Sequence, residues 1–259
     1  SINWAPNANW LGGLVAQPDP TSTVRFFTDQ TMSGGTVSIS NNVGSQVFNR
    51  VELDGNASPS AATTITLTGQ ALSLQGNSPE IALHANIAAY GLYYDLQLPL
   101  TLSTQTLLSG DGDANFRISG IISGTGGLIK TGASTLTLTG STTFSGGVTI
   151  KNGTLESRTT QTTLGSGTVT MGGSGSTGVT YLTGQNNSNR FVINAPDSGS
   201  IAIGANGAGS GFTLSGGISL NGNLNIRTFD NGVSVGAWAT KTNVSSAQFG
   251  EGMALQSCT

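Results

Sequence analysis

The pattern that decides the fold lies in residues 120–156, which read GIISGTGGLIKTGASTLTLTGSTTFSGGVTIKNGTLE. Three short runs of alternating side chains, at 127–130, 135–139 and 148–151, are each closed by a turn that contains glycine. In the middle run the two leucines point to one side and the threonines between them to the other. This is the period of a half-buried strand, so we predict three short strands here.

The same local pattern occurs twice within this stretch. Lys130 and Lys151 each follow an isoleucine and precede a Thr-Gly or Asn-Gly step, and they lie about 20 residues apart, one coil of a solenoid. Two lysines aligned on neighbouring coils would repel each other, so we expect both to lie at exposed turns.

The alternation of glycine turns and short strands continues from about residue 24 to about residue 244. We therefore predict an all-β chain, folded as a right-handed parallel β-helix, or β-solenoid, with an N-terminal aromatic cap-like segment. A pair of β-sandwiches is the alternative. Residues 80–108 alternate apolar and polar side chains, so strands are favoured over a helix there, and Tyr90, Tyr93 and Tyr94 are expected to form a local aromatic bulge or face.

The composition limits the classes of partner. Charged residues make up 8% of the 259 residues and hydrophobic residues 36%, which excludes a disordered polyelectrolyte. The net charge of -3 is scattered, so no nucleic-acid partner is expected. No apolar run approaches the roughly 20 residues of a membrane-spanning segment. The arginines are isolated in sequence and are expected to be local turn anchors or contact residues: Arg25, Arg50, Arg117, Arg158, Arg190 and Arg227.

The first residues differ in composition from the rest. Residues 1–28 contain Trp4, Trp10 and three prolines, and we predict an N-terminal cap that covers one end of the strands. A sugar-stacking platform formed by the tryptophans is the alternative. We divide the chain into this cap, a solenoid body at 29–244, and a C-terminal tail at 245–259 that contacts another subunit.

Residues 120–156 resemble the autotransporter-associated β-strand repeat, also called the passenger-associated transport repeat. The resemblance implies right-handed β-helices of secreted or surface-exposed bacterial proteins, and it implies a role in structure and export rather than catalysis. Residues 3–27 also resemble the segment that precedes such solenoids. The residues that carry the repeat pattern are Gly124, Gly126, Gly127, Leu128, Lys130, Gly132, Thr135, Leu136, Leu138, Gly140, Phe144, Gly146, Ile150, Gly153 and Leu155.

Few residues could carry chemistry. His84 is the only histidine and no nucleophile motif accompanies it, so we expect no catalytic or metal site and no cofactor. Asp111 and Asp113 could ligate calcium or form an acid pair, but a solvated hairpin turn is expected. Cys258 is the only cysteine; a free thiol is expected, with an intermolecular disulfide as the alternative.

These observations favour a structural, non-enzymatic protein that is secreted or lies on a bacterial cell surface. We expect copies of the chain to assemble head to tail into a filament or surface layer. The alternative is an adhesin or carbohydrate-binding passenger, whose partners are host or environmental glycans. Its candidate contacts are Trp4, Trp10, Tyr90, Tyr93 and Tyr94. A polysaccharide-degrading β-helix enzyme ranks last.

Overall fold

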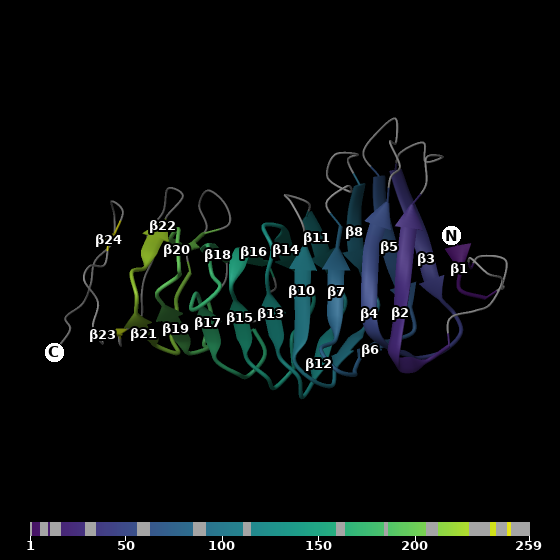
Figure 1. Ribbon diagram of the computed structural model, residues 1–259, viewed down its shortest axis with the longest axis horizontal. Helices are drawn as coiled ribbons and strands as arrows, with labels where there is room; N and C mark the ends of the chain where they lie inside the picture. Colours follow the sequence, from purple (N-terminus) through teal and green to yellow (C-terminus); the bar gives the residue numbers. More distant parts are fainter. Residues whose placement is uncertain are drawn as a thin grey trace.

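The chain folds into a stack of short strands along one axis, with β1 and β2 at one end and β23 and β24 at the other (Figure 1). The computed structural model describes residues 2–5, 10, 17–28, 35–55, 63–84, 92–110, 115–158, 164–183, 186–205, 212–227, 239–241 and 248–249. Within this part there is no helix, and every strand pairing is parallel. The predicted β-solenoid is confirmed, and the sandwich alternative is wrong because its sheets are antiparallel.

One face of the solenoid is an 11-stranded parallel sheet. Its strands, in spatial order, are β1 (Ile2–Asn3), β3 (Gly35–Asn41), β5 (Thr63–Gly69), β8 (Leu92–Leu96), β11 (Asn115–Ile118), β14 (Thr135–Leu138), β16 (Asn152–Ser157), β18 (Gly178–Thr183), β20 (Ile201–Gly204), β22 (Asn225–Arg227) and β24 (Gln248–Phe249).

The second sheet has 13 strands and forks at β4 (Gln46–Gly55). The first part of β4 pairs with β6 and the later part with β7, and β2 lies along its other side. The short branch is β6 (Leu72–Leu74), β9 (Leu100–Leu102) and β12 (Ile122–Gly124). The long branch is β7 (Glu80–Leu83), β10 (Thr106–Gly110), β13 (Leu128–Lys130), β15 (Val148–Ile150), β17 (Val169–Met171), β19 (Phe191–Asn194), β21 (Ile218–Asn221) and β23 (Ala239–Lys241), and β2 is Asp19–Thr28.

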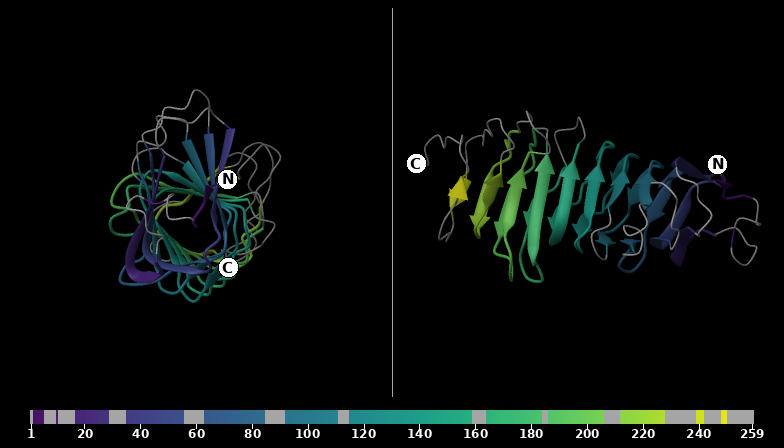
Figure 2. Two further views of the ribbon diagram at one scale, coloured as in Figure 1. Left: turned by 90° about the vertical axis from the view of Figure 1, so that its right-hand side faces the viewer. Right: turned by 90° about the horizontal axis from the view of Figure 1, so that it is seen from above.

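Because of this fork, a coil in the first half of the stack has three sides. The chain passes from β8 in the 11-stranded sheet to β9 in the short branch, then to β10 in the long branch, and returns to the first sheet at β11. End-on, the coils lie over one another around a shared interior (Figure 2). Residues that meet across neighbouring coils are separated in sequence by as few as 19 residues, between β14 and β16, and by as many as 37, between β1 and β3.

The interior is filled by apolar side chains that lie in register from coil to coil. In the 11-stranded sheet one such column is fully buried, at 1% exposure or less, because every second residue of each strand faces inward. Its members, in register order, are Ile65, Tyr94, Phe116, Leu136, Leu155, Tyr181 and Ile203. The alternation seen in the sequence therefore becomes one continuous core.

Glycine occupies corners where neighbouring coils approach too closely for a side chain. Gly132 has a φ of +71°, and a Cβ on it would lie 1.9 Å from the carbonyl oxygen of Gly110. Gly153, one coil later, also has a φ of +71°, and its Cβ would lie 2.4 Å from the carbonyl oxygen of Gly132. The Thr-Gly and Asn-Gly steps that recur in the sequence are thus stacked corners that only glycine fits.

The close approach at these corners predicts that adding one methyl group to a corner glycine destabilises the fold. We expect Gly132→Ala to lower the free energy of unfolding by about 3 kcal/mol, because left-handed backbone strain of about 1 kcal/mol adds to a clash of about 2 kcal/mol. Gly175→Ala is the matched control, since Gly175 has a φ of +83° and open space within 4 Å of its Cβ. It should cost only about 1 kcal/mol. Chemical denaturation measures both; equal losses would mean that close approach does not select glycine here.

Candidate functional site

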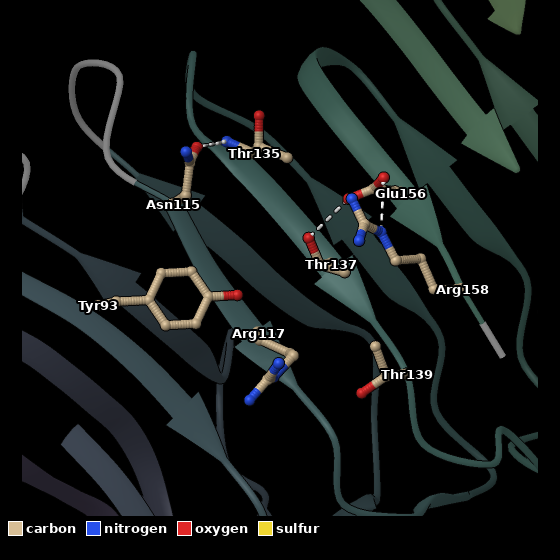
Figure 3. Close-up of a pocket in the computed structure, with 8 residues that line it drawn as sticks. All are labelled: Tyr93, Asn115, Arg117, Thr135, Thr137, Thr139, Glu156 and Arg158. Atoms are coloured by element: carbon tan, nitrogen blue, oxygen red, sulfur yellow. Dashed lines mark hydrogen bonds and ion pairs between the residues drawn. The ribbon is translucent and has the colours of Figure 1, made fainter. Parts of the chain in front are cut away.

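A hollow of about 310 Å³ lies on the outer face of the 11-stranded sheet, across β8, β11, β14 and β16 (Figure 3). It is open and polar, and one aromatic ring lies at one end of it, opposite an arginine–glutamate pair (Figure 3). It is lined by Tyr93, Asn115, Arg117, Thr135, Thr137, Thr139, Glu156 and Arg158.

The register of the coils brings these residues together from distant parts of the chain. Arg117 on β11 pairs with Asp95 on β8 and with Thr137 on β14, and Thr137 pairs in turn with Glu156 on β16. These four residues form one row across the sheet. They face outward because the residues on either side of each of them in the strand face the core.

Asp95 fixes the first arginine of the row. Its side chain is 0% exposed and accepts hydrogen bonds from Arg117 (2.5 Å), Ser119 (2.7 Å) and Gln97 (2.9 Å). Burial alone would raise the pKa of Asp95, but these hydrogen bonds and the charge of Arg117 together hold its pKa below the usual value. The same pair raises the pKa of Arg117 above its usual value. Both groups are charged, and the guanidinium is held in place.

A second ion pair lies at the other end of the hollow. Glu156 accepts the Oγ1 hydroxyl of Thr137 at 3.0 Å and pairs with the Nε of Arg158 at 2.8 Å (Figure 3). The Glu156 side chain is nearly buried, whereas Arg158 is more than half exposed. The terminal nitrogens of Arg158 are therefore left at the surface of the hollow.

Tyr93 supplies the aromatic ring. Burial raises the pKa of its phenol, so the hydroxyl is protonated at neutral pH. The guanidinium carbon of Arg117 lies 5.8 Å from the ring centroid, within the range of a cation–π contact. Asn115, beside Tyr93, accepts the backbone N–H of Thr135 at 3.2 Å (Figure 3).

The sequence predicts that the tyrosines lie together, but Tyr93 and Tyr94 point to opposite faces of the sheet. Tyr93 lies on the outer side of β8, but Tyr94 is fully buried and donates its hydroxyl to the carbonyl oxygen of Asp54 at 2.7 Å. Adjacent residues of a strand point to opposite faces, which separates the two rings. Tyr90 lies outside the described residues.

The two tryptophans lie at the β1 and β2 end of the solenoid. The Trp4 side chain is 2% exposed and packs against Trp10 in an edge-to-face arrangement, with ring centroids 5.4 Å apart. It also contacts Phe26 and Phe48, at centroid distances of 5.6 and 6.3 Å. The Trp10 indole donates to the Trp4 carbonyl oxygen at 2.6 Å. The face of Trp4 is therefore occupied by neighbouring rings within the chain.

The prediction that Lys130 lies at an exposed turn is wrong. Its side chain is 1% exposed and points into the core, in a column where its neighbours on adjacent coils are Leu108 and Ile150. The ammonium donates to the carbonyl oxygens of Thr131 (2.6 Å), Gly132 (3.0 Å) and, on the next coil, Asn152 (3.4 Å). These carbonyl groups belong to the glycine corners and compensate the burial of the charge.

The other lysine of the repeat behaves differently. Lys151 is half-buried, and its ammonium lies 3.4 Å from the carbonyl oxygen of Ser174. The two lysines do not meet across the ladder, because Lys130 is in register with Ile150. The electrostatic repulsion expected between them therefore does not arise.

Four of the arginines that are isolated in sequence make ion pairs in the structure. Arg25, Arg50, Arg117 and Arg158 each pair with a carboxylate, and three of the four lie inside strands. Arg50 bridges Glu52 (3.0 Å) on its own strand and Glu80 (2.9 Å) on β7. These pairs could not be predicted from sequence spacing, because most of the partners lie on different coils.

Of the remaining candidate residues, the structure describes only His84. His84 is half-buried, with its Nε2 atom 3.9 Å from Glu52. Asp111, Asp113 and Cys258 lie outside the described residues. Within the described ranges, no three His, Cys, Asp or Glu side chains are placed to hold a metal ion, and no helix is long and apolar enough to cross a membrane.

Comparison with known proteins identifies the repeat. Residues 128–156, from β13 to β16, match the family model of the passenger-associated transport repeat, as the sequence pattern predicted. Residues 223–253 match the model described as exopolysaccharide biosynthesis protein YbjH, but most of this segment lies outside the described residues. No curated protein and no solved structure matches the chain.

The chain thus contains a passenger-associated transport repeat that forms part of a β-solenoid. The repeat and the fold together support a β-helix protein of the surface or passenger type. The repeat family is also the basis for expecting a secreted or surface location.

Burial lowers the pKa of Lys130 from 10.5 to about 8. Between these two values the unfolded chain binds more protons than the folded chain, so stability rises with pH in this window. The cost of burying the charge is therefore fully present below pH 8 and is relieved as the pH rises toward 10.5. We expect the free energy of unfolding to increase on the order of 3 kcal/mol over this range because of Lys130 alone.

The Lys130→Met variant isolates this effect from the tyrosines and the other lysine. Met has a similar length and no titrating group, so the difference in unfolding free energy between the two proteins should shift in favour of the wild type from pH 8 to pH 10.5. Denaturant titrations at several pH values measure it. A difference independent of pH would show that the carbonyl oxygens keep Lys130 charged throughout.

Proposed function

We propose that this protein is a structural β-solenoid, secreted or displayed on a bacterial surface, whose copies assemble head to tail into a filament or layer. The repeat at residues 128–156 supports the extracellular location. The assembly is proposed from the geometry of the two ends of the stack.

The observation that carries this proposal is the single strand direction in both sheets. All pairings are parallel from β1 and β2 at one end to β23 and β24 at the other. The far edge of one copy therefore has the direction needed to continue the near edge of the next copy. Such a contact joins two different surfaces and repeats without closing, which gives an open filament.

The near end offers a long edge for this contact. β2 has 10 residues and, among the described strands, pairs only with β4. Phe27 on this strand is 50% exposed. An unpaired edge of this length is a template for another strand.

The interior at this end is already filled. Trp4 packs against Phe26 of β2 and Phe48 of β4, so apolar rings close the centre of the end coil. An incoming copy would therefore add backbone hydrogen bonds along the rim of the coil without burying a large side chain in its centre.

The composition also favours close association of copies. Charged residues form only 8% of the chain, and its net charge is -3. Repulsion between copies is therefore small, and it is screened further beyond about 8 Å at physiological salt.

Charges on β2 should block assembly. We expect the full chain to form filaments visible by negative-stain electron microscopy, and Thr23→Lys/Phe27→Lys to give monomers by light scattering. Both positions are exposed on β2, and like charges on an edge strand oppose pairing.

Ser166→Lys is the matched control, because Ser166 is exposed on the side of the solenoid, between β16 and β17. It adds a positive charge away from both ends and should leave filaments intact. Wild-type protein that stays monomeric at high concentration, without fibres on the grid, would refute end-to-end assembly.

A further inference from the structure

The polar hollow on the 11-stranded sheet contains an aromatic ring, hydroxyl groups and paired charges. A protein with a purely structural role does not need such a combination of side chains on its surface. We propose that the hollow binds an uncharged polysaccharide, with the glycan chain lying along the solenoid axis across β8, β11, β14 and β16. The argument rests on the groups in the hollow, their rigidity, their charge balance and the length of the row.

The hollow presents the groups that recognise sugars. The hydroxyls of Thr135 and Thr139 and the NH2 group of Asn115 make no hydrogen bond within the described part of the chain. They supply donors and acceptors spread over neighbouring strands, which suits the several hydroxyls of a pyranose ring. The planar guanidinium of Arg158 adds a fork of donors for a pair of adjacent oxygens.

Tyr93 supplies the complementary apolar surface. A pyranose has one face of C–H groups, and an aromatic ring with a polar tip suits a ligand that is apolar on one side and hydroxylated at its rim. The ring lies at one end of the hollow and Arg158 at the other (Figure 3), so one ligand could contact both.

The charged side chains are held in place before any ligand arrives. Arg117 is fixed by the buried Asp95, and Arg158 is oriented by Glu156, which also accepts from Thr137. A ligand would then bind to side chains that have already lost their rotational freedom, which lowers the entropic cost of binding. Asp95, Arg117 and Glu156 lie on strands, which hold side chains more precisely than loops do.

The charge balance selects the class of glycan. The two guanidiniums in and beside the hollow each face one carboxylate, so the site carries no net charge. An acidic polysaccharide or a nucleic acid would need uncompensated cations for its anionic groups. A neutral glycan can form hydrogen bonds with the polar groups of the hollow without separating either ion pair.

The dimensions favour a chain over a single sugar. β8 and β16 are separated by three strand spacings of about 4.8 Å, a length of about 14 Å. The row Asp95, Arg117, Thr137 and Glu156 runs along this direction, one residue to each coil. A short run of pyranose rings would therefore lie across the strands and parallel to the axis.

The experiment uses the full chain. The protein is first applied to an array of neutral and acidic glycans. It is then titrated calorimetrically with three neutral oligosaccharides, maltohexaose, cellohexaose and a hexamer of N-acetylglucosamine, and with a galacturonic acid hexamer as an acidic comparison. We expect binding to at least one neutral oligosaccharide and none to the acidic one.

Two variants then locate the site. Tyr93→Ala and Arg158→Gln should each weaken binding about ten-fold, the loss expected for one stacking or bidentate contact. Arg190→Gln is the matched control for charge, because Arg190 is exposed next to the long branch of the 13-stranded sheet. Tyr94→Phe is the control for the neighbouring buried ring, and both controls should bind as the wild type does.

Circular dichroism and thermal unfolding establish that each variant is folded. Arg158 is exposed, so its variant tests the site even if Tyr93→Ala misfolds. The proposal is overturned if no neutral glycan binds on the array or at millimolar concentration in solution. It is equally overturned if acidic glycans alone bind, or if both hollow variants bind as tightly as Arg190→Gln.

Discussion

Every level of this structure depends on the backbone hydrogen bonds between one coil and the next. The strands are short, and none could satisfy its amide groups alone, so each relies on the coils on either side. Parallel pairing between coils requires that corners stack on corners and inward residues on inward residues. The apolar column from Ile65 to Ile203 and the glycine corners at Gly132 and Gly153 are two results of that requirement.

The same ladder creates the chemistry of the outer face. Asp95, Arg117, Thr137 and Glu156 come from four strands and become neighbours only because the register aligns them. Ion pairs between coils and hydrogen bonds from threonine then form a surface that no single coil contains. In this architecture a binding surface is a property of several coils at once.

The fold could be predicted from the sequence because it depends on local signals. Alternation gave the strands at 128–130, 135–138 and 148–150 to within a residue, and recurring glycine gave the corners. Lys130 was misplaced for an instructive reason. The alternation puts it on the same side as Leu128, which is inward, but the repulsion expected between Lys130 and Lys151 predicts exposure. The compensating carbonyl oxygens belong to corners whose geometry the sequence does not reveal.

The hollow could be predicted only in part. Tyr93 was singled out as an aromatic residue, and the period of the strand could have separated it from Tyr94. Its arginine and carboxylate neighbours could not be foreseen. Arg117 and Asp95 are 22 residues apart, whereas Thr137 and Glu156 are 19 apart, so no fixed spacing aligns the row. The alignment depends on how many residues each corner uses.

That variable corner length has a consequence for how such a protein can change. Coils that differ in length, from 19 to 37 residues, still present their strands in one unbroken ladder. An insertion at a corner alters what the protein displays and leaves the hydrogen-bonded body as it was. The cost of closing a longer loop grows only slowly with its length. The solenoid is therefore a support on which surface features can be exchanged one coil at a time, without redesign of the core beneath them.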